Sequence, residues 1–483
     1  MMKRYVILFL LGLFCAVQGL SPGVALAAVD RPTVGAGIPG AVTKTNPETS
    51  EKKALDEAKK EASPSRTEAA EPAEKEEPTS KNEAVEKPKP PKAGKDESTE
   101  PLGRVAKPEP RIRVGLSEGQ ISAVVTSDAA YALSDVKTER EIEKIGAGKQ
   151  TTVTVKSGAL VVNGKTVAAK ALRFVVADDR TARHLAVAGE KYRGHIVLSL
   201  AADGTITVIN EVKLDDYIGG VISEEMSPDW PSEALKAQAV AARTFAVYSL
   251  GLHDEDGYDV CATTHCQVYG GIESESPEGL RAVSATRGEI LTYQGKAIYA
   301  AFHASSGGMT AGSEEAGGMA LPYLKPVRDS GDQATPNRHW QVSLSVRELS
   351  SKLAASGFSV GSLKALGLTP LKVGQGAPDR YPSGRVEQVR FVGSKQTVSV
   401  SGTKLRWMLG LPGTLFEIHL DKEAAKGKID LSGKDAAKLV FDGYGRGHGI
   451  GLAQWGAKAM AAQKQYREIL GHYYKGVEFT FIF

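Results

Sequence analysis

Residues 234–250 read ALKAQAVAARTFAVYSL, a stretch that contains neither Gly nor Pro. One face of a helix at these positions carries Leu235, Ala239, Ala242 and Ala246. This spacing of three and four residues predicts a helix. The preceding Asp-Trp-Pro-Ser-Glu, residues 229–233, is typical of a helix start, with Asp229 as the cap. Because so many side chains are alanines, we expect another element to pack very close to this helix.

The sequence on the N-terminal side of this helix is typical of short strands. Runs of β-branched residues alternate with turn residues at 121–126, 151–155, 159–162, 195–200 and 205–209. The dipeptide Asn163-Gly164 follows one of these runs, and Asn-Gly between two such runs indicates a hairpin. We therefore expect residues 111–212 to form a mostly β part.

Strands and helices mix on the C-terminal side. The residue patterns predict strands at 289–293, 297–302 and around 386–400, and helices at 345–356 and 452–462. Together with the mostly β part, they predict an α+β fold in two packed subdomains, with residues 213–483 as an α+β part of its own.

Composition separates the first quarter of the chain from the rest. The chain has 483 residues and a net charge of +3, which argues against a nucleic-acid-binding protein. There is no Phe, Tyr or Trp between Phe14 and Tyr131. A segment without large apolar side chains cannot offset the entropy of ordering its backbone. We therefore expect residues 28–110, rich in Glu, Lys, Pro and Ala, to be a disordered linker.

The N-terminus is typical of an export signal. Lys3 and Arg4 precede an apolar run at 5–17, and Ala25-Leu26-Ala27 follows. Residues 1–27 are therefore expected to be either a cleaved signal peptide or a signal that stays as a single membrane anchor. In both cases the rest of the chain is exported.

Two neighbouring carboxylates occur in the stretch VISEEM, residues 221–226. On a helix Glu224 and Glu225 point about 100° apart, so only one of them can face a given site. A carboxylic acid held beside Ile222 and Met226 would have a raised pKa, which a general acid requires. The alternative is a pair of solvated glutamates.

The segment Cys261-Ala-Thr-Thr-His265-Cys266 places thiols and an imidazole close together, and His253 lies eight residues before it. Such a set can supply the four nitrogen and sulfur ligands of tetrahedral zinc. A Cys261–Cys266 disulfide in an oxidising compartment is the main alternative, and free thiols are another.

Two histidines are framed by glycines. His303 precedes Ser-Ser-Gly-Gly, and His448 lies between Gly447 and Gly449, a few residues before Gln454-Trp455. Glycine lets a backbone approach a ligand closely, and a Trp beside polar groups can stack on a sugar. The alternative for each histidine is a turn in which the ring is hydrogen-bonded to the backbone.

These segments together resemble the stage II sporulation protein D / amidase enhancer family. The resemblance covers roughly residues 111–483 and rests on Leu214–Tyr217, Val221–Met226, Ala234–Thr244, Cys261–Tyr269, Pro322–Lys325 and Gly445–Trp455. It implies a lytic transglycosylase that cuts the bond between N-acetylmuramic acid and N-acetylglucosamine in peptidoglycan, leaving 1,6-anhydromuramic ends. The implied substrate is glycan already denuded of stem peptides by a cell-wall amidase, during wall remodelling or sporulation engulfment.

The resemblance also implies roles for particular residues. Glu225, which directly precedes Met in the family's Ser-Glu-Met pattern, would be the catalytic acid beside a glycan-binding cleft. The expected substrate-binding residues are Lys236, Arg243, Tyr323, Lys325, His303, His448, Gln454 and Trp455. The expected ligands of a structural zinc are His253, Cys261, His265 and Cys266. The implied location is the cell wall or the outer face of the cytoplasmic membrane.

Two other functions remain open from the sequence. A wall-binding scaffold would stimulate a separate amidase without cutting glycan itself. A zinc amidase or peptidase would need an open metal site and would release peptides instead of sugars.

Overall fold

The computed structural model describes residues 107–176, 184–336, 338–421 and 423–483. The expected export signal at 1–27 and nearly all of the expected linker at 28–110 lie outside the described residues.

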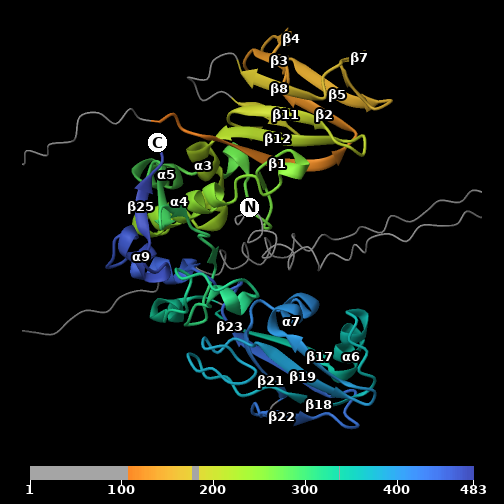
Figure 1. The fold of residues 1–483 in the computed structure, drawn as a ribbon, viewed down its shortest axis with the longest axis vertical. Helices are drawn as coiled ribbons and strands as arrows, with labels where there is room; N and C mark the ends of the chain where they lie inside the picture. Colours follow the sequence, from red (N-terminus) through yellow and green to blue (C-terminus); the bar gives the residue numbers. More distant parts are fainter. Residues whose placement is uncertain (1–106, 177–183, 337, 422) are drawn as a thin grey trace, which may run out of the picture. The chain divides into compact units, whose positions relative to one another are not determined.

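The first part of the described chain is built from strands, as its β-branched runs predicted. The strands are β1 (Arg111–Gln120), β2 (Ser122–Thr126), β3 (Tyr131–Asp135), β4 (Glu141–Ile145), β5 (Gln150–Lys156), β6 (Ala159–Val162), β7 (Lys165–Thr166), β8 (Ala171–Val176), β9 (Leu185–Val187), β10 (Glu190–Tyr192), β11 (His195–Leu200) and β12 (Ile206–Lys213) (Figure 1). One sheet has the order β13-β1-β12-β11-β8-β3-β4, and a second has the order β10-β9-β2-β5-β6-β7. The short β13 (Val260–Cys261) joins the first sheet parallel to β1.

The predicted Asn-Gly hairpin is confirmed. β6 and β7 pair antiparallel with Val162 opposite Lys165, so Asn163 and Gly164 form the two-residue loop. Both loop residues have positive φ, 47° for Asn163 and 84° for Gly164. This is the backbone that a tight hairpin requires and that Asn and Gly adopt most readily.

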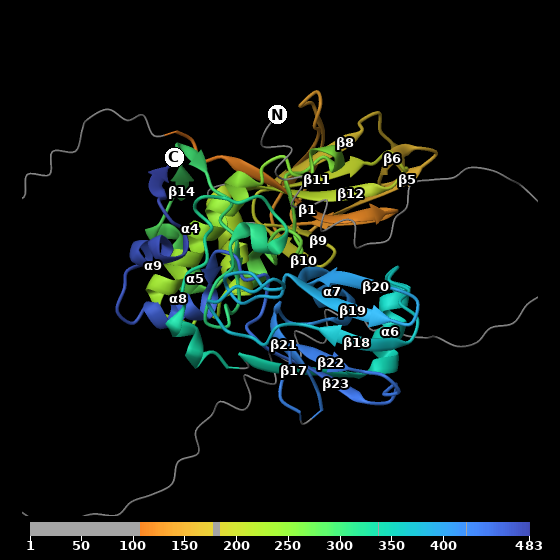
Figure 2. The same ribbon diagram turned by 60° about the horizontal axis from the view of Figure 1, so that its bottom comes forward.

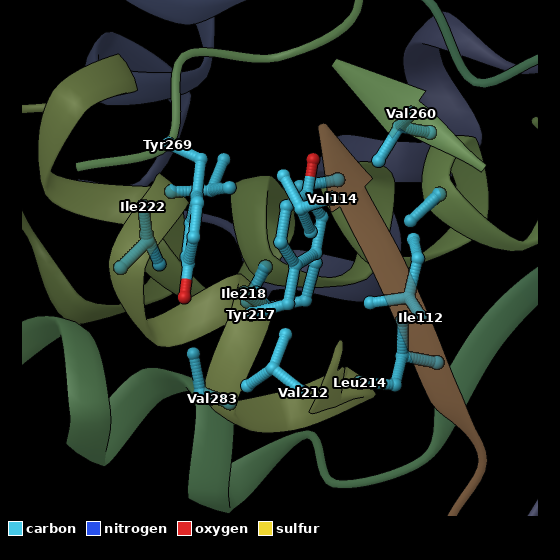
Figure 3. Packing of buried hydrophobic residues seen from close by; sticks show 14 of the residues in the cluster. Ile112, Val114, Val212, Leu214, Tyr217, Ile218, Ile222, Val260, Tyr269 and Val283 are labelled. Carbon is cyan, nitrogen blue, oxygen red and sulfur yellow. The ribbon is translucent and has the colours of Figure 1, made fainter. Parts of the chain in front are cut away.

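Two helices follow β12 and carry much of the central core. These are α3 (Leu214–Glu225) and α4 (Ser232–Tyr248). Tyr217 and Ile218 of α3 are fully buried and lie beside Ile112 and Val114 of β1 (Figure 3). At Gly220, a Cβ atom would lie 2.5 Å from the ring of Tyr269, so this close approach of α3 requires glycine.

The helix predicted at 234–250 is confirmed, and its alanines are buried as expected. Helices α5 (Pro277–Ala285), α8 (Gln454–Met460) and α9 (Tyr466–Tyr473) pack around α4 (Figure 2). The start of α4 differs from the expectation, because the capping position is Pro231 and not Asp229. Pro231 has a φ of −53° and a ψ of 138°, and the proline ring locks φ near this value.

The remaining elements lie between α4 and the C-terminus. The short helices are η1 (Asp254–Asp256), η2 (Gly271–Ser274), η3 (Ser313–Ala316) and η4 (Ser330–Ala334). The further strands around the central core are β14 (Glu289–Tyr293), β15 (Lys296–Ala297), β16 (Phe302–His303), β24 (Leu452–Ala453) and β25 (Glu478–Phe481). The second hydrophobic core is formed by β17 (His339–Ser345), α6 (Val346–Ala355), β18 (Leu363–Gly367), β19 (Gln388–Gly393), β20 (Thr397–Ser401), α7 (Gly402–Leu409), β21 (Leu415–Leu420), β22 (Lys428–Asp430) and β23 (Lys438–Tyr444).

A local cap sets the start of one predicted helix, and a pairing between distant strands sets the start of another. Ser345 caps α6, because its Oγ accepts from the N–H of Glu348 at 3.1 Å and its own N–H donates to Oε2 of Glu348 at 2.7 Å. The helix expected at 452–462 begins at Gln454, because Leu452 and Ala453 instead pair with Phe302 and His303.

The α+β class with two packed cores is confirmed, but the cores divide the chain differently from the sequence boundary at 212/213. One hydrophobic cluster runs from Ile112 through α3 and α4 to Tyr474 and so spans that boundary. The other runs from Trp340 to Phe441. In the described part of the chain, no helix is long and apolar enough to cross a membrane.

Candidate functional site

Glu225 is the last residue of α3, and donors from two distant segments reach its carboxylate. Nε2 of Gln454 donates to Oε2 of Glu225 at 3.2 Å. The backbone N–H of Val268 also donates to this carboxylate. The next residue, Met226, is buried and leaves the helix in an extended conformation. The carboxyl group is therefore fixed between the end of α3, the start of α8 and the segment around Val268.

The environment of Glu225 favours the protonated acid. Its pKa is raised from 4.5 to about 7: burial is the largest cause and the charge of Glu224 adds to it, while the bonds from Gln454 and Val268 act in the opposite direction. The C-terminal end of a helix carries a partial negative charge, which also disfavours a carboxylate. A carboxyl group with a pKa near neutrality can both give and take a proton at neutral pH.

The two neighbouring glutamates have different surroundings, as the helical geometry predicted. Glu224 is exposed, and its Oε1 accepts a short hydrogen bond from the hydroxyl of Ser274. Glu225 is half-buried and faces Gln454. The solvated alternative thus applies to Glu224 alone.

The position of Gln454 depends on a pairing between strands that are far apart in the sequence. β16 and β24 pair parallel, with His303 opposite Ala453, and α8 begins at the next residue. The N–H of Trp455 donates to the carbonyl oxygen of Ala304 at 3.1 Å and fixes the first turn of α8. The buried Gln454, one of the expected binding residues, is thereby directed to Glu225.

Trp455 lies beside a second tryptophan, Trp230, which was not among the expected binding residues. Its ring centroid lies 4.8 Å from that of Trp230, with the planes inclined by 59°. The ammonium of Lys458 lies 4.4 Å from the Trp455 centroid and 4.8 Å from the Trp230 centroid. The sequence could have indicated Lys458, because it follows Gln454 by one helical turn. It could also have indicated Trp230, because that residue follows Glu225 closely in the chain.

The two glycine-framed histidines bond to the backbone, which is the alternative that the sequence left open. Nδ1 of His303 donates to the carbonyl oxygen of Ile450 at 3.0 Å, and burial holds the pKa of His303 well below its usual value. His448 accepts from the N–H of Ile450 at 3.0 Å, and its Nε2 donates to the carbonyl oxygen of Phe302 at 2.8 Å. Burial lowers the pKa of His448 to about 4. Both rings are neutral and hold the loop before α8, while their expected role in substrate binding stays a prediction.

Arg243 is enclosed by the protein. Its side chain is fully buried, and its Nε lies 2.6 Å from Oδ1 of Asp215. Its other nitrogens donate to the carbonyl oxygens of Glu289 at 3.0 Å and Val283 at 3.3 Å. Arg243 therefore joins α4 to α3, α5 and β14, and the expectation that it contacts glycan is corrected.

The three remaining expected binding residues differ in their access to solvent. Nζ of Lys236 is paired with Oε1 of Glu233 at 2.7 Å. Tyr323 is buried, and its hydroxyl accepts from the N–H of Tyr299 at 3.2 Å, so its ring is not free to stack on a sugar. Lys325 is exposed.

The expected zinc ligands converge. The ligand atoms of His253, Cys261, His265 and Cys266 all lie within 4.8 Å of one another. Sγ of Cys266 lies 3.5 Å from Nε2 of His253 and 3.6 Å from Nδ1 of His265, which is also 3.6 Å from Sγ of Cys261. Metal–ligand bonds of 2.0–2.3 Å in a tetrahedron put neighbouring ligands about 3.5 Å apart. Both thiols are free, so the set fits a metal ion and no disulfide is formed.

The metal-ligand cluster and Glu225 are joined by a short segment. β13 fixes Cys261 to β1, and the N–H of Tyr269 donates to the carbonyl oxygen of Ala262 at 3.2 Å. Gln267 between them is buried and accepts from the hydroxyl of Tyr217 at 3.1 Å. This closed loop presents the N–H of Val268 to Glu225.

Known proteins resemble the chain over more than half of its length. The family model described as stage II sporulation protein matches residues 202–293. The stage II sporulation protein D of Bacillus amyloliquefaciens is 32% identical over 291 residues, 56% of this chain and 75% of that protein. The amidase enhancer of Bacillus subtilis is 30% identical over 367 residues, which is 68% of this chain but only 49% of the relative. An uncharacterized protein of Brachyspira hyodysenteriae is 33% identical over 369 residues, 76% of this chain and 92% of its own.

Proposed function

Because the chain belongs to the stage II sporulation protein D family, we propose that it is a peptidoglycan lytic transglycosylase with Glu225 as its acid. The observation that carries the proposal is the half-buried carboxyl group of Glu225, with its pKa raised to about 7 and its position fixed by Gln454 and Val268. Such a group is suited to protonating the oxygen of a leaving sugar.

One carboxyl group is sufficient for this reaction. Glycosidases that use water normally need two carboxylates, one of them to activate the water or to attack the sugar. In a lytic transglycosylase the sugar supplies its own nucleophile, the C6 hydroxyl of N-acetylmuramic acid. The neighbouring acid in the sequence, Glu224, bonds to Ser274 and leaves Glu225 to act alone.

The proton moves twice. Glu225 donates its proton to the glycosidic oxygen as the bond to C1 of N-acetylmuramic acid breaks, and N-acetylglucosamine leaves as an alcohol. The resulting carboxylate takes the proton of the C6 hydroxyl while O6 bonds to C1, which closes the 1,6-anhydro ring and restores the acid. The donors Gln454 and Val268 stabilise the carboxylate between the two transfers.

We assign a structural role to zinc. His253, Cys261, His265 and Cys266 would hold the ion and, as four protein ligands, would complete its tetrahedral shell. A bound ion would stabilise the segment that presents the N–H of Val268 to Glu225. A metal site with a full shell argues against a zinc amidase or peptidase.

The chain's setting follows from the same proposal. Peptidoglycan lies outside the cytoplasm, so the enzyme would be exported and act in the wall or at the outer face of the membrane. A partner amidase would remove stem peptides before Glu225 acts on the glycan. The second candidate function, a non-catalytic scaffold for such an amidase, is favoured by the relative named amidase enhancer.

Mass spectrometry of denuded glycan strands separates the two functions. The full chain is expected to produce anhydromuramic ends, Glu225→Gln to produce none, and the matched control Glu224→Gln to remain active. Circular dichroism and glycan binding establish that the Glu225→Gln variant is folded. Intact strands from folded, glycan-binding wild-type protein, together with stimulation of an added amidase, would instead establish the scaffold.

A further inference from the structure

Lys458 is held in a fixed place by two aromatic rings. Its ammonium lies within 5 Å of both the Trp230 and Trp455 centroids, at 4.8 and 4.4 Å. Distances below about 6 Å favour a cation–π interaction, which restrains a long side chain before any ligand arrives. All three side chains are half-buried, so solvent reaches the cluster.

The α8 helix places this ammonium near the acid. Gln454 and Lys458 are four residues apart on α8, and residues with this spacing lie on the same helix face, one turn from each other. Gln454 donates to Glu225 from that face at 3.2 Å. The ammonium is therefore one helical turn from the group that holds the acid.

The charge of Lys458 is not neutralised within the described part of the chain, where it makes no ion pair. Of the three cations expected to bind glycan, Lys325 is exposed and the other two are paired. Lys236 is paired with Glu233 at 2.7 Å, and the buried Arg243 is paired with Asp215 at 2.6 Å. Lys458 therefore keeps a full positive charge for an anionic ligand beside the candidate acid.

We propose that Lys458, restrained by Trp230 and Trp455, binds the lactyl carboxylate of N-acetylmuramic acid and thereby selects glycan that carries no stem peptides. The inference rests on the proposed function and names the residue that would set its substrate preference. In a peptide-bearing strand this carboxylate is converted to an amide, which carries no charge and is bulky. An ammonium attracts the free carboxylate and gains little from the amide.

The neighbouring rings fit the same ligand. Sugars present apolar C–H faces that stack on indole rings, while their carboxyl substituents project from the ring edge. A site that joins two indoles with one ammonium can therefore contact both parts of a muramic acid residue. Because the ammonium is already restrained, little side-chain entropy is lost when the carboxylate binds.

Equilibrium binding in the full-length Glu225→Gln variant tests this role without turnover. The two ligands are a denuded tetrasaccharide of alternating N-acetylglucosamine and N-acetylmuramic acid and the same tetrasaccharide with its lactyl groups converted to carboxamides. We expect the free acid to bind about tenfold more tightly, as one charge-assisted contact implies. In this background, Lys458→Met should abolish the preference and Lys458→Arg should retain most of it. Lys464→Met, which removes an exposed lysine beyond α8, is the matched control and should have no effect.

Three results would overturn the inference. The first is that the protein with Lys458 intact binds the two ligands equally tightly. The second is that the preference for the free acid survives in Lys458→Met. The third is that Lys458→Met loses affinity for both ligands equally, which would indicate disturbed tryptophans. Cleavage by the wild-type chain is measured separately. Intact strands together with a preference that depends on Lys458 would refute the transglycosylase proposal alone, whereas cleavage without such a preference would refute the role of Lys458 alone.

Discussion

Replacing Glu225 by Gln should stabilise the folded protein at neutral and alkaline pH while it removes activity. The side chain keeps its size and its place beside Gln454, but it no longer ionises. The prediction follows from the raised pKa of the Glu225 carboxyl group, about 7 in the folded protein against an ordinary value of 4.5.

The size of the effect follows from that difference. One pKa unit corresponds to about 1.4 kcal/mol, so the range from 4.5 to about 7 corresponds to about 3 kcal/mol. This is an upper bound because solvent reaches part of the side chain. Below pH 4.5 the group is protonated in both the folded and unfolded states and contributes no difference. As the pH rises toward 7 the unfolded state ionises first, so wild-type stability falls, and above about pH 7 the full cost is present.

Urea unfolding of the full chain at a series of pH values from 4 to 9 measures the effect. The free energy of unfolding of Glu225→Gln relative to wild type should rise by up to about 3 kcal/mol between the acid and alkaline ends. Glu224→Gln is the matched comparison: it removes only the charge that adds to the raised pKa of Glu225, so its difference from wild type should rise much less with pH.

A pH-independent difference between the Glu225→Gln and wild-type proteins would refute this reasoning. It would mean that the carboxyl group ionises in the folded protein as it does in the unfolded chain. Glu225 would then be mostly ionised at neutral pH, and its assignment as a general acid would lose its physical basis.

Three further predictions concern other parts of the site. Gln454→Met removes a donor that favours the ionised acid, so the pKa of Glu225 should rise and the alkaline limb of the pH–rate profile should move up by about one unit. Arg243→Met leaves Asp215 buried without its partner and should lower the free energy of unfolding by about 3–5 kcal/mol, with no change in the KM of the folded enzyme; a raised KM at unchanged stability would contradict the buried role. A zinc chelator should lower the melting temperature of the wild-type protein by several degrees but leave that of Cys261→Ser unchanged, as scanning calorimetry of the two proteins would show.

Much of the fold could be predicted because its causes are local. The run of buried alanines gave α4, the Asn163-Gly164 dipeptide gave a hairpin, and Ser345 with Glu348 closed the cap of α6. Each of these depends on backbone preferences within a few residues. The exact starts of α4 and α8 were harder to predict. Pro231 takes the capping position expected for Asp229 in α4, and the pairing of β24 with β16 shortens α8.

The candidate site was predicted less evenly. The helical turn indicated that the two neighbouring glutamates would differ, and the family resemblance pointed to Glu225. The four metal-ligand residues converge as their spacing indicated. Residues with a charge or a ring were harder to place. Arg243 and His303 have the chemistry of binding residues, but both are buried and bonded within the protein.

The sequence by itself determined the helix at 234–250, the strand-rich first part and the close grouping of thiols and imidazoles. These features depend on side-chain periodicity and short spacing. Only the tertiary structure decided which groups surround the acid, because Gln454 reaches Glu225 across 229 residues through the pairing of β16 with β24. It also decided that Lys458 keeps its charge while Arg243 does not meet solvent. Burial and hydrogen bonding set a group's pKa and its access to a ligand, and both depend on neighbours in space that local sequence does not specify.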